Sequence, residues 1–370
     1  MHTLALAVTL LYALGMGFIA VIVAVSRSRR DLNYFPMVSI IMAARNEEKN
    51  IGECLRSITA LSYPKKLLEV IVVDDRSSDS TPEIIQQFVD ANRFIKLVSA
   101  GPSSEGLQGK VNALDQGIAA SKGEILMFTD ADCTVPKSWV ESTVRYYADE
   151  KIGIVAGFIS IRQRSPLGSV QAIDWYGLLT AASATASIGF PFTAVGNNFS
   201  IRRKAYNLVG GYQGIPFSIT EDFALLHAVT SRAGMKAVIP LDPESTIITN
   251  ACRTWKELYS QRKRWFVGGR GMDFSRILVF FPAFVFCFFI LFGWMFLPLP
   301  TWGIMTVVKL LVDFLMVLPA LRSTRQIKLA RYWIPFEGYF TLYVFLLPIV
   351  VLISRRVEWK GRHFGKSVPG

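Results

Sequence analysis

The segment Glu124–Pro136, with the sequence EILMFTDADCTVP, joins an apolar run to two aspartates that stand one residue apart, Asp130 and Asp132. An apolar run of this length that ends in turn residues is typical of a buried strand. Carboxylates at the C-terminal end of such a strand face the crevice where open α/β sheets bind ligands. Two acids this close repel each other unless a cation lies between them, and Mg²⁺ or Mn²⁺ held by carboxylates and substrate phosphates suits the arrangement. The segment alone is equally compatible with a polar loop after a strand.

Upstream of this segment, apolar runs alternate with amphipathic stretches. Asn46 is a candidate helix N-cap with Glu47 and Glu48 in the first turn, and Pro82 fits the first turn of a later helix. Strands that alternate with helices predict a mostly parallel sheet, flanked by helices, in an α/β fold. The predicted strands are Met37–Ala44, Leu67–Val73, Phe94–Ser99 and Glu124–Thr129, and a predicted helix at Gly109–Ser121 precedes the last of them.

A second predicted strand also ends in acids, Asp74 and Asp75. Either acidic pair alone can merely terminate a strand, but two at the C-terminal edge of one parallel sheet indicate a single ligand site. The first strand is not followed by G-x-G-x-x-G, and the sequence contains no G-x-x-x-x-G-K-[ST]. A dinucleotide fingerprint and a P-loop are therefore excluded. What remains is a nucleotide held by acids and a metal.

The composition predicts a membrane protein, because 51% of the 370 residues are hydrophobic and only 18% are charged. Thr3–Val25 carries no charge and is long enough to cross a bilayer. The basic residues Arg27–Arg30 follow this run rather than precede it, which favours an uncleaved anchor over a signal peptide. The positive-inside rule then places the N-terminus outside and the middle domain in the cytoplasm, as expected for an integral protein of the cell membrane. The net charge of +12 gathers near apolar segments, so no nucleic-acid partner is predicted.

The C-terminal region contains three further apolar stretches, Arg276–Leu297, Pro300–Leu321 and Trp333–Ile353. Lys309 and Asp313 lie inside the second stretch at i and i+4, so they can pair on one helix face. If every apolar stretch crosses the membrane, the basic tail ends outside, against the positive-inside rule. Either the last stretch is re-entrant or interfacial, or the tail is an exception. We therefore predict one N-terminal and two to three C-terminal membrane helices.

Four segments follow one another in a fixed order: VSIIMAARNEEKNI, VIVVDDRSSDST, GKVNALDQGI and MFTDADC. In order and spacing they resemble the membrane-bound family-two glycosyltransferases, which are inverting enzymes of GT-A type. The resemblance implies that Asp75 accepts hydrogen bonds from a nucleotide base, usually uracil. It implies that Arg45 and Glu47 line the nucleotide pocket, and that Lys110 lies near the nucleotide.

The same resemblance implies that Asp130 and Asp132 hold Mg²⁺ or Mn²⁺ on the diphosphate of the donor, with Asp130 counted among the nucleotide-binding residues. It also implies that Asp222, within SITEDFALLHAV, is the catalytic base. From the residues alone, Thr220 is a candidate N-cap, and acids after it favour the positive end of a helix. Many relatives carry a further acid soon after this motif, where this chain has Ala224.

A Q-x-x-R-W pattern is met by Gln261, Arg264 and Trp265, within a predicted amphipathic helix. Its composition suits a helix in the membrane interface. The resemblance implies a second role beside the acceptor and the diphosphate, because a guanidinium can pair with a diphosphate and an indole can stack on a sugar. Asn197 and Asn198 resemble a family stretch beside the sugar but are equally good turn formers.

Another predicted helix, Leu167–Ile188, either lines an acceptor groove or packs as a core helix. The stretch is rich in Ala and Ser, has few charges and contains the neighbours Asp174 and Trp175.

These observations predict a glycosyltransferase that moves a sugar from a nucleotide sugar, a UDP-sugar by the resemblance, to a membrane lipid with inversion. A processive polysaccharide synthase of the hyaluronan or cellulose synthase type is one alternative, and an inactive membrane scaffold is another. The sequence indicates neither the sugar nor the oligomeric state. The predicted regions are an N-terminal anchor at 1–30, a cytosolic GT-A domain at 36–250, an interfacial helix at 251–272 and a membrane region with a basic tail at 273–370.

Overall fold

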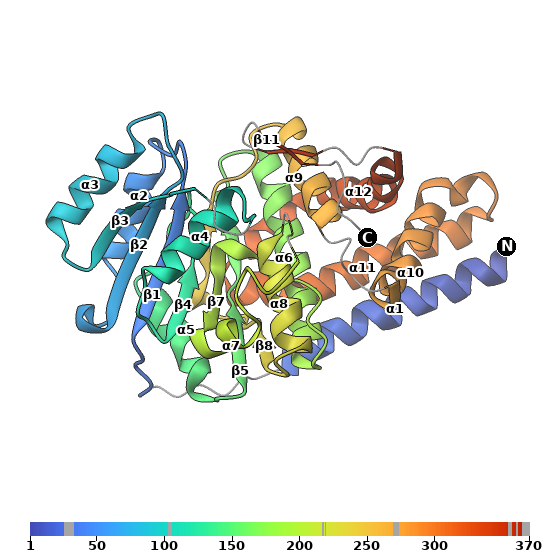
Figure 1. The fold of residues 1–370 in the computed structure, drawn as a ribbon. Coiled ribbons are helices and arrows are strands. Elements are labelled where there is room, and N and C mark those ends of the chain that lie inside the picture. The colour runs from blue at the N-terminus through green and yellow to red at the C-terminus, as the bar shows by residue number, and fades with distance from the viewer. Residues whose placement is uncertain are drawn as a thin grey trace. The chain divides into compact units, whose positions relative to one another are not determined.

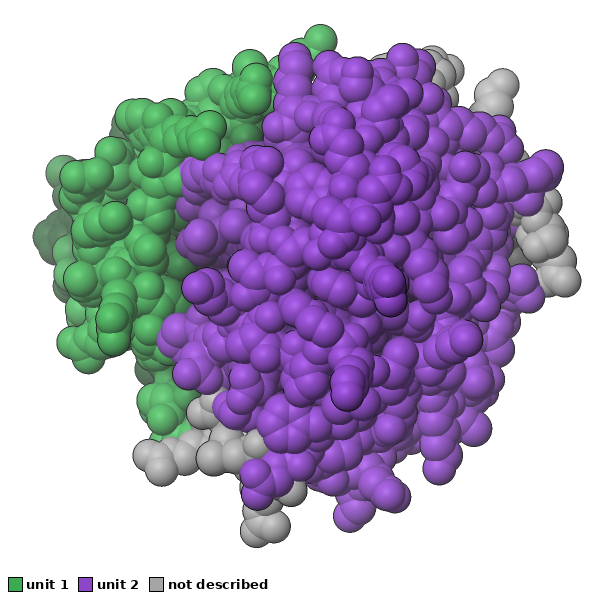
Figure 2. Space-filling model, turned by 90° about the vertical axis from the view of Figure 1, so that its left-hand side faces the viewer, with its two compact units in different colours: residues 1–25, 163–184, 251–370 green, residues 26–162, 185–250 purple. Residues whose placement is uncertain are grey.

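The computed structural model describes residues 1–25, 33–102, 106–216, 218, 220–268, 274–353, 357–359 and 362–364. The chain divides into two compact units, which are coloured green and purple in Figure 2. Unit 1 consists of residues 1–25, 163–184 and 251–370, and unit 2 consists of residues 26–162 and 185–250.

A seven-stranded sheet forms the centre of unit 2, with the strand order β3-β2-β1-β4-β7-β5-β8 (Figure 1). Only β7 runs antiparallel to its neighbours β4 and β5, so the prediction of a mostly parallel sheet is confirmed. Strands β1, β2 and β4 are apolar and almost wholly buried. The strands are β1 (Val38–Ala44), β2 (Leu68–Asp74), β3 (Ile95–Ser99), β4 (Ile125–Phe128), β5 (Ile152–Ala156), β7 (Phe199–Arg202) and β8 (Lys236–Val238).

Helices flank this sheet, and α4 lies against β1 and β2. Gly117 makes this close approach possible, because a Cβ at that position would lie 2.7 Å from an Ile41 methyl carbon and 2.9 Å from one of Val73. A separate parallel pair joins β6 (Ile159–Ile161) to β9 (Ile247–Thr249). The helices of unit 2 are α2 (Ile51–Thr59), α3 (Thr81–Ala91), α4 (Gly109–Ala119), α5 (Trp139–Val144), α7 (Arg203–Leu208) and α8 (Glu221–Ser231).

The strand order places a topological switch point between β1 and β4. From β1 the chain continues to β2 and β3 on one side, and it returns to form β4 on the other side of β1. The loops that leave the carboxyl ends of β1 and β4 therefore diverge, and they open a crevice of the kind in which α/β sheets bind ligands.

The prediction that Asn46 caps a helix is wrong. Helix α2 begins at Ile51 with Asn50 at the N-cap position. Asn46 instead adopts a left-handed backbone, with φ of 54°, and its side-chain Oδ1 accepts a hydrogen bond from the Ser78 backbone N–H at 2.8 Å. Asparagine tolerates this conformation because its short polar side chain can bond locally. The residue thus ties the loop after β1 to the loop after β2.

In the residues of unit 1 that the structure describes, the regular structure is helical apart from one short antiparallel pair, β10 (Val357–Trp359) and β11 (Arg362–Phe364). Within this unit, α1 packs on both α10 and α11 (Figure 1). The helices are α1 (His2–Val25), α6 (Pro166–Ser187, most of it in this unit), α9 (Trp255–Gly268), α10 (Phe274–Phe292), α11 (Leu299–Ser323) and α12 (Trp333–Ile353).

Three segments of the described chain are long and apolar enough to cross a membrane: His2–Val25, Leu299–Ser323 and Ile327–Val351. The apolar segment Phe281–Met295 of α10 and the turn after it is shorter. This agrees with the prediction of one N-terminal and two to three C-terminal membrane helices. An apolar cluster holds the first half of α1 against the end of α10 and the start of α11; its buried members are Ala5, Tyr12, Phe286, Phe289, Leu297 and Met305.

Candidate active site

Two loops meet at the carboxyl ends of β1 and β2. The Asp75 backbone N–H donates to the Ala44 carbonyl at 2.8 Å, and the Arg45 guanidinium lies 3.8 Å from the Asp75 carboxylate. The Glu47 backbone N–H donates to the Thr81 hydroxyl at 2.8 Å. The structure therefore brings together the loops that carry Arg45, Glu47 and Asp75, three of the residues predicted to bind the nucleotide. Hydrogen bonds that involve backbone groups hold both loops in place. This edge of the sheet is therefore preorganised.

Asp130 and Asp132 follow β4 at the same edge. Burial, the charge of Asp130 and the charge of Glu47 together raise the pKa of Asp132 to about 6. The Asp132 carboxylate accepts a long bond from the Thr249 hydroxyl, at 3.4 Å, and one from the Cys133 thiol. The acids after β4 therefore lie close enough for the charge of one to affect the other.

Crowded carboxylates at a strand end suit a divalent cation, which prefers oxygen ligands. No group of three or more His, Cys, Asp or Glu side chains among the described residues is arranged to hold a metal. An ion bound by Asp130 and Asp132 would thus need further ligands from a substrate, as Mg²⁺ usually does. The residues present fit such a shared site.

Lys110 connects this edge to α8. Its Nζ lies 2.8 Å from the Asp130 carboxylate and 3.0 Å from the Glu221 carboxylate. Burial alone lowers the pKa of Lys110, but the two carboxylates outweigh it and raise the pKa above its ordinary value. Lys110 therefore stays charged at the point between the acids after β4 and the N-terminus of α8.

Asp222 begins the first turn of α8, next to Glu221. Its Oδ2 accepts a bond from the Gly196 backbone N–H at 2.6 Å, and its Oδ1 accepts one from the Phe223 N–H at 2.8 Å. Burial first and the charge of Glu221 second raise the pKa of Asp222 to about 7, against the lowering effects of these N–H groups and Lys110. A carboxylate with a pKa near neutrality and a fixed orientation is well suited to accept a proton.

The two asparagines before β7 have different surroundings. Asn198 is a structural residue: its side chain accepts from the Trp139 indole at 2.9 Å and donates to the carbonyls of Phe158 and Ser245 at 2.7 and 2.9 Å. The buried Oδ1 of Asn197 has no hydrogen-bond donor among the described residues. The two asparagines thus differ in their hydrogen bonding, a distinction the sequence did not make.

In unit 1, the Q-x-x-R-W motif lies on α9. Between its residues stands Arg262, which the sequence analysis did not single out, and Arg262 forms a buried ion pair with Asp174 of α6 at 2.5 Å. The Arg262 guanidinium covers the Trp265 ring at 4.2 Å, and the Trp175 ring meets Trp265 edge-on at 5.0 Å. The part of α6 in unit 1 is a packed helix, and its Asp174 holds α9, the helix that carries the motif. In the sequence, this ion pair was indicated by Asp174, a single acidic residue in a stretch without other charges.

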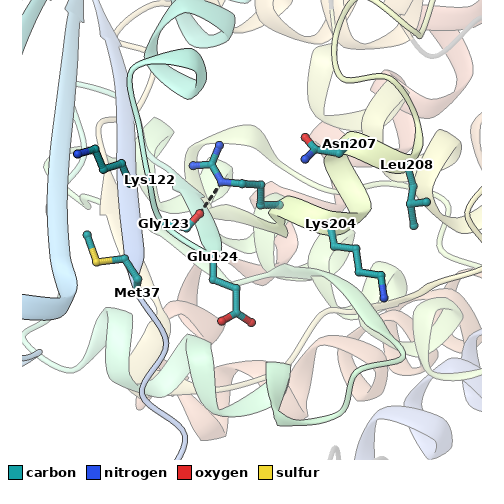
Figure 3. Close-up of a pocket in the computed structure, with 8 residues that line it drawn as sticks. Met37, Lys122, Gly123, Glu124, Lys204, Asn207 and Leu208 are labelled. Carbon is teal, nitrogen blue, oxygen red and sulfur yellow. Dashed lines mark hydrogen bonds between the residues drawn. The ribbon is translucent and has the colours of Figure 1, made fainter.

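Another hollow of unit 2 lies at the opposite ends of the strands. Its volume is about 590 Å³, and Figure 3 shows Met37, Gly123 and Glu124 beside it, next to the starts of β1 and β4. The Arg203 guanidinium donates to the Gly123 carbonyl at 2.6 Å. No predicted site residue lines this hollow. The candidate site is therefore the acidic edge and not this cavity.

Residues 39–222 match the family model described as Glycosyl transferase family 2. The chain carries a family 2 glycosyltransferase domain. This domain contains the loops after β1, β2 and β4 and ends at Asp222, so it includes every predicted nucleotide, metal and base residue. The resemblance inferred from four sequence segments is confirmed.

The relatives of the family 2 domain are named as synthases of different products. A beta-monoglucosyldiacylglycerol synthase from Synechocystis is 32% identical over 253 residues, which are 65% of this chain and 50% of the relative. A poly-beta-1,6-N-acetyl-D-glucosamine synthase from Staphylococcus aureus is 30% identical over 234 residues, or 63% and 54%. The chain thus spans about half the length of these relatives.

Among solved structures, a mannosyltransferase from Pyrobaculum calidifontis in complex with GDP-Man and Mn²⁺ aligns with a TM-score of 0.60. The alignment covers 95% of this chain and 96% of that one, at 18% sequence identity. The likeness supports the GT-A fold that was predicted for the family 2 domain.

Proposed function

We propose that this protein transfers a sugar from a nucleotide sugar to a lipid acceptor in the membrane, with metal assistance and inversion at the anomeric carbon. One observation carries the proposal. The acids after β4, the bridging Lys110, and a carboxylate with a pKa near 7 on α8 converge at one edge of the sheet. The arrangement provides a place for a charged leaving group and a base on separate elements.

Asp222 acts as the base. As the acceptor hydroxyl oxygen bonds to the anomeric carbon, its proton passes to the Asp222 carboxylate, and the bond from that carbon to the diphosphate oxygen breaks. A single displacement of this kind inverts the configuration. The Gly196 N–H holds the carboxylate in place at 2.6 Å, so little reorganisation is needed when the proton moves.

Asp130 and Asp132 would hold the divalent ion, Mg²⁺ or Mn²⁺, together with phosphate oxygens of the donor. When bound, the ion supplies Lewis-acid stabilisation of the charge on the departing nucleoside diphosphate. Lys110 exchanges its contact with Asp130 for that diphosphate. Arg45, Glu47 and Asp75 enclose the nucleotide, with Asp75 accepting hydrogen bonds from the base of a UDP-sugar.

The acceptor is a membrane lipid. Three segments of the described chain can span a membrane, and one relative is named for a glucosylated diacylglycerol. Trp265 and Arg264 of α9 bind the acceptor and the diphosphate of the donor. Trp265→Ala should then reduce transfer more than it reduces thermal stability; equal losses would make the ring a packing residue of α9.

A processive polysaccharide synthase is the second candidate, because another relative is named for a polymer of N-acetylglucosamine. The two candidates differ in product size. Purified protein in lipid is incubated with radiolabelled UDP- and GDP-sugars, Mn²⁺ and a lipid extract, and the label is then followed.

Our proposal expects label in a single small glycolipid that partitions into organic solvent, and none with Asp222→Asn. Label in material of high molecular weight would favour the polymer synthase. Absence of transfer from every donor, in protein that binds nucleotide, would contradict the lipid acceptor. Asp90→Asn, on the exposed face of α3, is the matched control for the loss of one carboxylate.

A further inference from the structure

A second cluster of charged side chains lies within unit 1, among the apolar helices. Lys309 Nζ donates to the Asp313 carboxylate at 2.8 Å and to the Glu337 carboxylate at 2.5 Å. The Tyr12 hydroxyl donates to Asp313 Oδ1 at 2.7 Å. The side chains of Lys309, Asp313 and Glu337 are only 2%, 4% and 5% exposed. Helices α1, α11 and α12 therefore meet at one polar point.

The charges in this cluster do not balance. One ammonium faces two carboxylates, and the other titratable groups turned toward it are the Tyr12 hydroxyl and the Cys287 thiol of α10. The ring of Phe340 covers the Lys309 ammonium at 5.4 Å. If both carboxylates are ionised, the cluster has one excess negative charge inside segments that cross a membrane. An unbalanced charge at that depth is costly, so such residues pair or neutralise.

The hydrogen bonds show which carboxylate of the cluster has an oxygen without a donor. Glu337 Oε2 accepts from Lys309, whereas the buried Oε1 has no donor among the described residues. The Asp313 and Glu337 carboxylates are held close together, because both accept from the single Lys309 ammonium. Two carboxylates cannot bond to each other, because both are only acceptors, but a carboxylic acid donates to a carboxylate. A single proton would remove the excess charge and satisfy the pair.

We propose that Tyr12, Lys309, Asp313 and Glu337 form a proton-binding site within the membrane region, in which Asp313 and Glu337 share one proton. The proton comes from water, and no other bond changes. A metal cation is a poorer occupant, because divalent ions need six or more oxygens and a single orphaned oxygen is present here. The site does not depend on the proposed transfer reaction.

The cluster lies where α12 contacts α11. Trp333 of α12 reaches Leu310 and Phe314 of α11, and both Glu337 and Phe340 reach Lys309. Two residues after Glu337, the Tyr339 hydroxyl lies 3.5 Å from the Asp174 carboxylate that holds the motif helix. Helix α12 thus contacts both the charged cluster and the Asp174–Arg262 pair.

Infrared spectroscopy of the full-length protein in lipid nanodiscs tests the proposal. At neutral pH, the difference spectrum of wild type minus Glu337→Gln should show the carbonyl band of a protonated carboxylic acid, to which Asp222 does not contribute because both proteins contain it. Asp313→Asn provides the same difference spectrum if the first variant does not fold. A neutral-pH wild-type spectrum without this band, or one unchanged in both variants, would overturn the proposal.

Thermal unfolding provides an independent readout. The folded state holds a proton that the unfolded chain releases at ordinary carboxyl pKa values, so wild-type stability should fall as the pH rises, by up to tenfold in the unfolding constant per pH unit. Glu337→Gln should lose this part of the pH dependence, and Glu257→Gln, on α9 outside the cluster, should keep it. If Na⁺ stabilises wild type but not Glu337→Gln at constant ionic strength, the site binds a metal cation and the proposal fails.

Discussion

Two lysines of this protein each bridge two carboxylates, but in opposite surroundings. Lys110 joins Asp130 and Glu221 in unit 2, where the three side chains are 21%, 36% and 12% exposed. Lys309 joins two carboxylates in unit 1 at 2% exposure. Water and solutes reach the first bridge, so its partners can be exchanged for a diphosphate and a cation. The second bridge is closed off by apolar helices, and only a proton can complete it.

The comparison shows that similar contacts can have different consequences. An exposed ion pair contributes little to stability, because water already solvates both charges. A buried pair contributes little in net terms as well, yet the loss of one partner leaves an uncompensated charge. Substitutions at the first bridge should therefore affect ligand binding and activity. Substitutions at the second should affect the stability of the fold.

The largest effect is expected at Asp222, the proposed base in unit 2. Asp222→Asn should reduce transfer by about 10²- to 10⁴-fold, the usual contribution of general base catalysis, because an amide does not accept the proton. Nucleotide binding should remain, as measured by calorimetry with UDP or GDP. Unchanged turnover would remove Asp222 as the base.

Replacing the two lysines tests the comparison directly. Lys309→Met leaves two buried carboxylates without their cation and should lower the free energy of unfolding by about 3–5 kcal/mol. Lys110→Met should lower it by about 1 kcal/mol or less, while weakening donor binding. Thermal and denaturant unfolding of both variants in the same detergent measures the difference. Equal stability losses would refute the contrast between the bridges.

The pH dependence of kcat/KM should reflect the ionisation of Asp222. The carboxylate must be ionised to accept a proton, and its pKa is raised to about 7, so kcat/KM should fall about tenfold per pH unit below that value. Glu221→Gln removes a negative charge that raises this pKa, so the acidic limb should move to lower pH. A limb that stays in place in this variant would show that another group controls the profile.

The smallest effect concerns the hydroxyl of Tyr12. Tyr12→Phe removes one donor to Asp313 and should lower stability by about 1 kcal/mol, without affecting nucleotide binding. Tyr259→Phe, on an exposed ring of α9, is the control and should have almost no effect. If Tyr12→Phe lowers the free energy of unfolding as much as we expect for Lys309→Met, the Tyr12 hydroxyl is as important to the cluster as the Lys309 ammonium.

Much of the exposed site could be predicted from the sequence, because strand ends and motifs report local structure. Asp75, Asp130 and Asp132 follow apolar runs, and the runs define the edge at which the acids meet. The Lys309–Asp313 pair was predictable for the same local reason, its i and i+4 spacing. The predicted helix cap at Asn46 failed because a tertiary bond to Ser78 outweighed the local preference.

The remaining partners come from distant helices, and no local pattern indicates them. Tyr12 and Glu337 reach the second cluster from α1 and α12, which only the folded unit brings to α11. Asp174 likewise meets Arg262 across 88 residues of sequence. Single polar residues in apolar stretches were visible, but their partners depend on helix packing, which hydrophobic periodicity does not specify.

The central claim is a metal-dependent nucleotide site at the acidic edge of unit 2. A thermal-shift titration of the purified full-length protein with UDP and GDP, with and without Mn²⁺, tests it most directly. We expect the melting temperature of wild type to rise with one nucleotide only when Mn²⁺ is present, and Asp132→Ala to remain folded but lose the rise. No shift with either nucleotide in folded wild type, or an equal shift in Asp132→Ala, would contradict the site described here.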